Sequence, residues 1–301
     1  MRKSAGACLG VILYMTVAVA ANSEQRCTDA GDYDAVVMAC GEAIRENSYN
    51  TDALSHRGLA FLENGEYDRA IADFAQIVAL IPEDPHAYHD RGLAHFMKGD
   101  YERAIADHSE AIKRQPEPYF FDDRGRAYRM QGNLDAALAD HSEAIRLAPT
   151  NDLFYAQRAE DHRVRKQYTR AIADMTEAIR LDPADDGHLA ARARIHMAKR
   201  DYNSAIVDLT AAIGLDPADS RHYTARALAY LKARKTPRAY LDTQKALELR
   251  SDAPDLLELR GRVLQALNAR ARAIEAYRKA LAVDPRLTAS RIALWRLRAG
   301  T

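Results

Sequence analysis

The apolar positions between residues 51 and 84 fall into two runs that are separated by a short polar break. The first run contains Leu54, Gly58, Phe61 and Leu62, and the second contains Ala70, Ile71, Phe74, Ile77 and Val78. Spacings of three and four residues place each run on one face of a helix. Residues 64–66 interrupt the pattern, and Pro82 ends the second run because proline cannot continue a helix. The segment therefore predicts two antiparallel helices that approach closely where Gly58 faces Ala70.

The same pattern returns along the chain at intervals of 33 or 34 residues. Each copy has a small residue at Gly58, Gly92, Gly125, Ala159, Ala193, Ala227 or Gly261. An alanine follows twelve residues later, at Ala70, Ala104, Ala137, Ala171, Ala205, Ala239 or Ala273. A further twelve residues on stand Pro82, Pro116, Pro149, Pro183, Pro217, Ser251 and Pro285. Each pair of helices leaves an apolar flank that only the next pair can cover, so the copies are predicted to stack.

These residues resemble the tetratricopeptide repeat. With residue 51 as position 1, the resemblance rests on a small residue at position 8, an aromatic at 11, glycine at 15, tyrosine at 17, alanine at 20 and 27, and proline at 32. The copies are 51–84, 85–117, 118–151, 152–185, 186–219, 220–253 and 254–287. The resemblance covers roughly residues 27–287 and implies an all-α, right-handed superhelical solenoid of antiparallel helix hairpins. It also implies a concave groove that is lined by the first helix of each hairpin. Such a groove binds other proteins and catalyses no reaction.

The first twenty residues follow a different pattern. A basic pair follows Met1, residues 7–19 are almost continuously apolar, and residues 18–20 are small. This arrangement predicts a secretory signal peptide over residues 1–20 that is cleaved after Ala20. The alternative is an uncleaved anchor, but the apolar run is shorter than the roughly 20 residues that a membrane span needs. We therefore expect an exported protein that has no stable membrane insertion after cleavage.

A shortened hairpin over residues 21–50 precedes the seven copies and is expected to cap them. A shift of 34 residues places Cys27 in register with Phe61 and Cys40 in register with Phe74. These are positions 11 and 24, where bulky side chains of the two helices of a repeat meet. We predict a disulfide between Cys27 and Cys40, and the alternative is a pair of reduced, buried thiols. Because disulfides persist outside the cytoplasm, the signal peptide and the bridge together indicate the periplasm.

The last segment, residues 288–301, predicts one further helix and a short tail. Ile292, Leu294 and Trp295 are expected to cover the apolar flank of the last hairpin. The stack would then have a cap at each end, as repeat proteins need for solubility.

Arginine recurs at position 7 of every copy, and aspartate recurs at position 23 of six copies. The arginines are Arg57, Arg91, Arg124, Arg158, Arg192, Arg226 and Arg260. The aspartates are Asp73, Asp107, Asp140, Asp174, Asp208 and Asp242. We predict a structural ladder of ion pairs near the seam between helices, and the alternative is a stripe of arginines that binds anions. The sequence leaves open whether the pairs lie within or between hairpins, because Ala276 replaces the aspartate of the last copy.

Histidine occupies positions 11 and 24 five times, at His95, His108, His141, His162 and His196. A row of histidines could hold a metal ion or haem. We instead interpret these histidines as flat substitutes for aromatic core residues, because only His95 and His108 are expected to touch and two ligands make a poor zinc site. No cofactor is therefore predicted. The burial of these rings predicts that the fold softens below about pH 6.

The resemblance assigns positions 2, 5, 9 and 12 of each first helix to the concave groove. The expected groove residues are Leu59, Leu62, Leu93, Phe96, Tyr119, Arg126, Arg129, Arg163 and Arg194, followed by Leu228 and Leu231. The groove is thus expected to be apolar, then basic, then apolar again. Such a groove suits a protein or peptide segment with acidic and aliphatic residues.

The composition and the absence of catalytic motifs favour a binding protein. Lys and Arg together number 43, as do Asp and Glu, so no general attraction to nucleic acid is implied. The sequence contains no glycine-rich phosphate loop, no His-Glu-x-x-His and no Gly-x-Ser-x-Gly motif. We therefore expect a scaffold or adaptor of the cell envelope and no enzyme. The alternatives are a regulatory or substrate-presenting subunit of an envelope enzyme, such as cell-wall or exported-polymer machinery, and a carrier of metal or haem.

Overall fold

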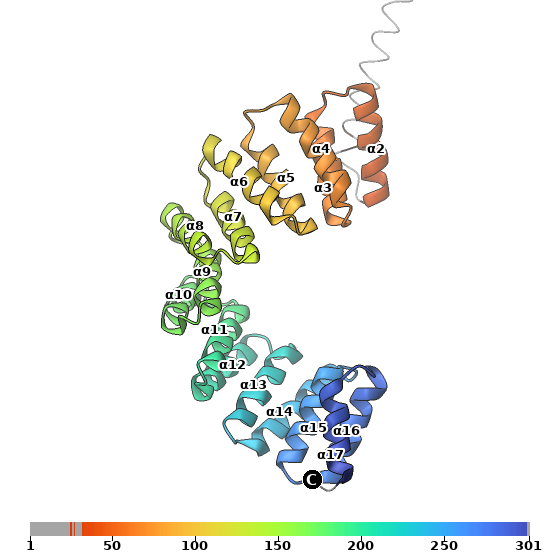
Figure 1. Ribbon diagram of the computed structural model, residues 1–301, viewed down its shortest axis with the longest axis vertical. Helices are drawn as coiled ribbons and strands as arrows, with labels where there is room; N and C mark the ends of the chain where they lie inside the picture. The colour runs from red at the N-terminus through yellow and green to blue at the C-terminus, as the bar shows by residue number, and fades with distance from the viewer. Residues whose placement is uncertain (1–24, 26, 28–31, 300–301) are drawn as a thin grey trace, which may run out of the picture. The chain divides into compact units, whose positions relative to one another are not determined.

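The computed structural model describes Gln25, Cys27 and residues 32–299, which form α-helical hairpins (Figure 1). The predicted signal peptide, residues 1–20, and most of the first helix of the predicted N-terminal hairpin lie outside the described residues. Sixteen helices and no strand are found in the part of the chain that the structure describes. The all-α hairpin fold that the sequence predicts is therefore confirmed.

The chain forms two compact units that divide between Pro149 and Thr150. The loop at residues 148–151 has the same length as the loop at residues 182–185 and also contains a proline. No sequence signal therefore marks the division.

In the first unit, α2 (Tyr33–Glu46) packs against the first of three hairpins. The hairpins are α3 (Thr51–Glu63) with α4 (Tyr67–Leu80), α5 (Pro85–Lys98) with α6 (Tyr101–Arg114), and α7 (Pro118–Gln131) with α8 (Leu134–Leu147). Each hairpin of this unit packs on the next one, as the uncovered apolar flank of a single repeat requires.

The second unit contains four hairpins and a closing helix. The hairpins are α9 (Asp152–Val164) with α10 (Tyr168–Leu181), α11 (Asp186–Ala198) with α12 (Tyr202–Leu215), α13 (Ser220–Lys232) with α14 (Thr236–Leu249), and α15 (Pro254–Ala266) with α16 (Arg270–Val283). The closing helix α17 (Thr288–Ala299) packs against α16. None of the helices in the described residues of either unit is long and apolar enough to cross a membrane.

Local sequence signals explain where the helices begin. Asp84, Asn151 and Asp185 precede first helices, and their side chains accept hydrogen bonds from backbone N–H groups of the first turn. Such caps satisfy donors that have no partner within the helix. Pro85 and Pro254 occupy the first position of α5 and α15, where the missing N–H of proline costs nothing.

The turn inside each hairpin places one residue in the left-handed region. In the first unit these residues are Gly65, Gly99 and Gly132, with φ of 79°, 88° and 88°. In the second unit they are Lys166, Arg200, Arg234 and Asn268, with φ of 60°, 66°, 58° and 58°. A residue with a Cβ atom is disfavoured in this region by about 1–2 kcal/mol. The turns of the second unit are therefore more strained than those of the first.

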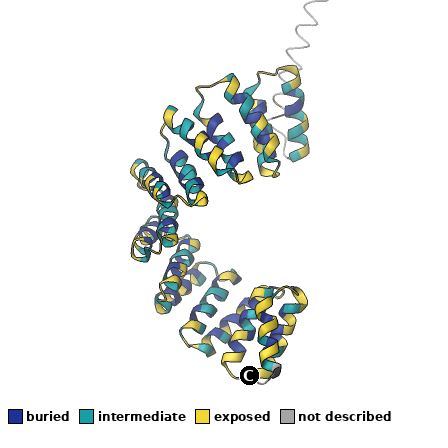
Figure 2. Ribbon diagram, viewed as in Figure 1, coloured by how far each residue is buried: buried dark blue, intermediate teal, exposed yellow. Residues whose placement is uncertain are grey.

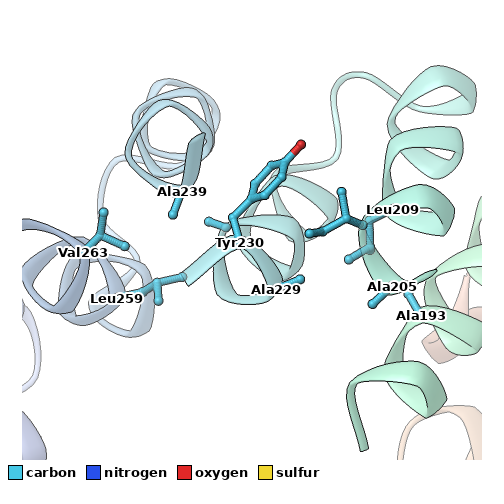
Figure 3. Packing of buried hydrophobic residues seen from close by; sticks show 10 residues of the cluster. Ala193, Ala205, Leu209, Ala229, Tyr230, Ala239, Leu259 and Val263 are labelled. Atoms are coloured by element: carbon cyan, nitrogen blue, oxygen red, sulfur yellow. The ribbon is translucent and has the colours of Figure 1, made fainter. Parts of the chain in front are cut away.

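Apolar side chains are buried where helices face each other, and exposed residues lie on the outer faces (Figure 2). Figure 3 shows one core cluster of the second unit. It combines side chains from five successive helices, including Ala193, Leu209, Tyr230, Ala239 and Leu259. The core is thus shared between neighbouring hairpins, which is why a single repeat cannot bury its apolar face alone.

The small residue at position 8 lies against a side chain of the second helix. A Cβ atom at Gly58 would lie 2.8 Å from the ring of Phe74, and one at Gly261 would lie 2.6 Å from the ring of Tyr277. The close approach that the sequence predicts at Gly58 thus has the ring of Phe74 as its nearest neighbour. The ring at position 24 takes the space that the missing side chain leaves.

Positions 8 and 24 vary together along the chain. Where position 8 is glycine, position 24 is a ring, as in Gly58–Phe74, Gly92–His108, Gly125–His141 and Gly261–Tyr277. Where position 8 is alanine, position 24 has no ring, as in Ala159–Met175, Ala193–Leu209 and Ala227–Thr243. A larger residue at position 8 is thus accompanied by a side chain without a ring at position 24, as close packing of the two helices requires.

The closing helix covers the last hairpin with fewer apolar residues than the sequence predicts. Leu294 is buried, with 8% of its surface exposed, and packs in a cluster with Tyr277. Ile292 and Trp295 are 46% and 68% exposed. The expectation that all three side chains cover the hairpin is wrong for Ile292 and Trp295, because successive residues of a helix point about 100° apart.

Candidate functional site

The two charged ladders pair within the hairpins. In six hairpins, Nε and Nη2 of the arginine on the first helix donate to the carboxylate of the aspartate on the second helix, at 2.6–2.9 Å. The structure thus answers the question that the sequence left open. Pairs that are desolvated in this way fix the register of two helices more than they add stability. The aspartates therefore occupy the Nε and Nη2 edge of these arginines, which favours the structural interpretation of the ladder.

Three of these arginines also reach the preceding hairpin. Their Nη1 atoms donate to a hydroxyl oxygen, in the pairs Arg124–Ser109 (3.0 Å), Arg192–Thr176 (3.1 Å) and Arg226–Thr210 (3.1 Å). The hydrogen bonds to Asp208 raise the pKa of Arg192 above its usual range. The ladder therefore joins the two helices of a hairpin and also links one hairpin to the next.

The seventh arginine, Arg260, has different partners because Ala276 replaces the aspartate. Its Nη1 donates to the backbone oxygen of Tyr240 at 2.7 Å and to Thr243 Oγ1 at 2.8 Å. Burial lowers the pKa of Arg260, which is the opposite of the shift at Arg192. This hairpin is thus an exception to the ladder.

Cys27 and Cys40 form a disulfide, with 2.03 Å between the Sγ atoms and 4.7 Å between the Cα atoms. Both residues are buried, and they pack with Ala43 of α2 and Ala53 of α3. The bridge therefore ties the chain before α2 to α2, beside the first complete hairpin.

In the first unit, the groove residues that the sequence predicts come from α3, α5 and α7. Leu59 is 40% exposed, whereas Leu62 packs against the core. The guanidinium of Arg126 lies over the ring of Phe96, 5.1 Å from its centroid. The remaining residues, Leu93, Tyr119 and Arg129, are partly buried. The predicted apolar start of the groove is thus only partly open to a ligand.

Arg126 belongs to a polar network with Asp123 and His89. Its Nη1 donates to Asp123 Oδ1 at 2.7 Å, and His89 Nε2 lies 2.9 Å from Asp123 Oδ2. Burial opposes the charged form of His89, but its hydrogen bonds to Asp123 and Asp90 raise its pKa to about 8. Asp123 therefore neutralises part of the positive charge that the sequence assigns to this stretch of the groove.

Two buried groups beside this network have strongly shifted pKa values. Burial raises the pKa of Asp122 to about 6 and lowers the pKa of His108 to about 3. The ring of His108 lies 5.3 Å from the ring of His89, a neighbour that the sequence does not predict. Neither ring nitrogen of His108 meets a hydrogen-bonding group among the described residues. This histidine thus fills an aromatic slot of the core, as Phe74 does one hairpin earlier.

In the second unit, Arg163 and Arg194 converge on Glu160. Arg163 donates two hydrogen bonds to this carboxylate at 2.6 and 2.7 Å. Nη2 of Arg194 lies 3.5 Å from the same group. The expected basic stretch thus has a carboxylate at its centre in this unit as well, so its positive charge is smaller than the number of arginines suggests.

A larger hollow lies further along the second unit. A cavity of about 610 Å³ is lined by Thr224, Ala225 and Leu228 of α13 and by Glu258, Leu259 and Arg262 of α15. A neighbouring cavity of about 380 Å³ shares Glu258 and Arg262 and extends to Ile292 of α17. Thr224, Leu228, Glu258 and Arg262 occupy positions 5 and 9, which belong to the groove. The hollow part of the groove therefore extends from α13 to α17.

Most charged groups around the larger cavity already have partners. Glu258 accepts a hydrogen bond from Ser290 Oγ at 2.9 Å. The ion pairs are Arg221 with Asp219 at 2.7 Å and Arg250 with Asp255 at 3.3 Å. Arg262 is exposed and forms no ion pair with another described residue. It is therefore the cation of this cavity that can bind an acidic side chain.

The sequence did not predict this part of the groove as the main site, because most of the arginines at groove positions lie in the middle copies. The positional rule, when it is applied to the last two copies, does point to Thr224, Glu258 and Arg262. The lining also includes Ala225 and Leu287. Neither residue occupies position 2, 5, 9 or 12 of a first helix, so the positional rule does not predict them.

Two aspartate–histidine clusters in the second unit contain metal-ligating groups. In each cluster the ligand atoms lie within 4.8 Å of one another, and the members are Asp152, Asp185 and His188, and Asp186, Asp219 and His222. Nε2 of His188 already lies 2.7 Å from Asp152 Oδ2, and Nε2 of His222 lies 2.6 Å from Asp186 Oδ2. We therefore interpret these pairs as links from α9 to α11 and from α11 to α13.

The hairpins and their repeat positions agree with a known family. Family models of the tetratricopeptide repeat match residues 29–85, 56–119, 89–152 and 156–220, and residues 254–287. The chain belongs to the tetratricopeptide-repeat family.

Several solved structures share this fold at low sequence identity. The C-terminal part of a TPR repeat-containing protein from Cytophaga hutchinsonii is 19% identical, with a TM-score of 0.63 over 79% of this chain and 98% of that chain. A tetratricopeptide repeat protein from Parabacteroides merdae is 17% identical, with a TM-score of 0.62 over 82% and 98%. The APC/C hetero-tetramer Cut9–Hcn1 contains a chain that is 17% identical, with a TM-score of 0.60, and the match covers 94% of this chain but 55% of that one. These similarities show the fold alone, and no curated protein matches the sequence.

Proposed function

We propose that the protein is a scaffold that binds another protein, and that the groove of α13, α15 and α17 holds an extended segment of this partner. The observation that supports the proposal best is the pair of adjoining cavities, about 610 and 380 Å³, that share Glu258 and Arg262. Cavities of several hundred Å³ are large enough to enclose side chains of a ligand. The first helices of the tetratricopeptide hairpins supply the lining, so the role needs no chemistry by the protein itself.

The lining indicates the chemistry of the bound segment. Ala225, Leu228 and Leu259 offer an apolar surface, and Leu287 adds to it. Arg262 supplies the cation that has no ion pair with the described residues. A segment with aliphatic side chains and one acidic residue complements this lining, because an opposite charge beside an apolar patch gives both affinity and orientation.

The proposed place of action is the cell envelope. The predicted signal peptide over residues 1–20 supports this proposal. The Cys27–Cys40 disulfide also supports it, because disulfides persist in oxidising compartments and are rare in the cytosol.

A crosslinking experiment tests the groove. The full chain carries a photo-crosslinking residue in place of Thr224 and is exposed to an envelope extract. We expect one dominant crosslinked partner, and Arg262→Glu should reduce its capture about tenfold, which corresponds to 1.4 kcal/mol of binding free energy.

The matched control is Arg278→Glu, which reverses the same charge on the exposed surface of α16. It should leave both the capture and the melting temperature unchanged. Equal capture by the Arg262 and Arg278 variants would show that the partner does not occupy this groove.

A further inference from the structure

One edge of the Arg260 guanidinium lacks the carboxylate that its six counterparts bind. In the other hairpins, Nε and Nη2 donate to both oxygens of an aspartate. In this hairpin the corresponding residue is Ala276, whose side chain ends at Cβ. Arg260 donates through Nη1 to Tyr240 and Thr243 and also contacts the side chain of Tyr240, but its Nε and Nη2 have no carboxylate partner among the described residues. Two N–H donors of a partly buried cation are thus left for another group.

A cavity of about 230 Å³ lies at the place of the missing aspartate. It is lined by Arg260, Ala276 and Arg272, and Leu257 and Leu264 form its apolar wall. These residues of α15 occupy positions 4, 7 and 11, whereas the groove uses positions 5 and 9 of the same helix. The cavity is therefore separate from the proposed partner groove.

The cavity has an excess of positive charge. The guanidinium of Arg260 lies 3.6 Å from the ring centroid of Tyr240, and that of Arg272 lies 5.1 Å from the same centroid. Glu275 is the carboxylate of the lining, and it pairs with Lys279 at 2.9 Å. Neither guanidinium forms an ion pair with a carboxylate within the described part of the chain. Burial, with the charge of Arg272 adding to it, lowers the pKa of Arg260.

The free edge of Arg260 is held in a fixed orientation. Its stacking on Tyr240 and the hydrogen bond from Nη1 to Thr243 position the plane of the guanidinium. Arg272 donates to the hydroxyl of Tyr240 and so helps to hold the ring in place. A ligand therefore meets two parallel N–H groups that need little reorganisation, which favours binding.

We propose that the cavity formed by Arg260, Arg272 and Ala276 binds a carboxylate that is carried on a short aliphatic chain. The carboxylate accepts the two hydrogen bonds that aspartate accepts in the other hairpins. Leu257 and Leu264 contact the aliphatic part of the ligand. The carboxylate belongs either to an acidic side chain of a polypeptide or to a small free acid, and both present the same chemistry.

The test follows the Nε–Hε signal of Arg260 by nuclear magnetic resonance in the full chain, with Arg260→Lys to assign it. The probes are sodium butyrate, the blocked peptide acetyl-Leu-Glu-Leu-amide and its acetyl-Leu-Gln-Leu-amide counterpart, at constant ionic strength. We expect a saturable shift of this signal with a Kd of about 1–10 mM, typical of a single charged contact. The glutamine peptide should produce no shift.

The probes also separate the two sources of the carboxylate. A response to the glutamate peptide assigns the site to acidic side chains, and a response to butyrate alone assigns it to free acids. Ala276→Asp supplies the missing carboxylate within the hairpin and should abolish the response while the fold is kept. The proposal is overturned if neither carboxylate shifts the signal, if the glutamine peptide acts equally, or if Ala276→Asp still responds.

Discussion

At the scale of single residues, the hairpins depend on how positions 8 and 24 share one space. Glycine at position 8 accompanies a ring at position 24, and alanine accompanies a side chain without a ring. The repeat pattern shows that position 8 must be small, but it does not show against what. Periodicity tells which face of a helix is buried, whereas the partner across the seam depends on side-chain direction. The contact between Gly58 and the ring of Phe74 is for this reason seen only in the structure.

Gly261→Ala is expected to destabilise the protein although alanine favours helices. The new Cβ would lie 2.6 Å from the ring of Tyr277, and overpacking of this kind costs about 1–3 kcal/mol. The double variant Gly261→Ala/Tyr277→Leu copies the Ala193–Leu209 pair and should recover part of the loss. Urea denaturation followed by circular dichroism measures the free energy of unfolding of each variant.

The matched control is Gly214→Ala. Gly214 also lies in a helix, but no atom lies within 4 Å of its added Cβ. This variant should be more stable than the parent by about 0.5–1 kcal/mol, as helix propensity predicts. If Gly261→Ala stabilised the protein by the same amount, the ring of Tyr277 would not limit the space at position 8.

At the scale of the element, the hairpin of α5 and α6 contains a buried histidine whose pKa is strongly lowered. His108 is fully buried, and its pKa lies at about 3, well below the usual value of 6.5. The folded state therefore favours the neutral ring. The charged or titratable groups that influence it are His89, Asp123, Arg124 and Arg126. His89 is the nearest ring, and its own pKa is raised to about 8.

The stability that neutral His108 contributes is complete above pH 6.5 and is lost as the pH falls towards 3. In this range the unfolded chain binds a proton at His108, whereas the ring stays neutral in the folded chain. His108→Phe keeps a ring over Gly92, as Phe74 lies over Gly58, but cannot be protonated. Between pH 7 and pH 5, the stability of the variant relative to the parent should rise by about 2 kcal/mol.

The comparison is made by urea denaturation of both proteins at each pH. His89 and Asp122, whose pKa values are raised to about 8 and about 6, titrate in both proteins, so their effects cancel in the difference. A difference that stays constant between the two pH values would mean that His108 is protonated in the folded state.

At the scale of the whole molecule, the sequence predicts the features that follow from the repeat register and misses those that the register does not determine. The period predicts the number and order of the hairpins, because each copy has the same packing problem. The register of Cys27 and Cys40 with a pair of core positions predicts their bridge for the same reason. The division between Pro149 and Thr150 has no counterpart in the pattern, since its loop is ordinary. The hollow at Arg262 is also lined by Leu287, which lies outside the repeated first helices.

The Cys27–Cys40 bridge should stabilise the N-terminal end of the array selectively. It joins residues that are 13 positions apart, and closing a loop of this length contributes about 3 kcal/mol through the entropy of the unfolded chain. The variant Cys27→Ser/Cys40→Ser is therefore expected to lose about this much stability in the first hairpins. Far-ultraviolet circular dichroism, which reports on all helices, should show an earlier onset of unfolding in urea.

The single tryptophan distinguishes a local effect from a global one. Trp295 is the only tryptophan of the chain and lies in α17, at the opposite end of the sequence. In a repeat array each hairpin interacts with its neighbours only, so the loss of one end is transmitted weakly along the chain. The fluorescence midpoint of Trp295 should therefore stay unchanged in the serine variant while the onset of the dichroism signal moves. A fluorescence midpoint that moved by the same amount would mean that all hairpins unfold as one cooperative block and that the bridge stabilises the whole array.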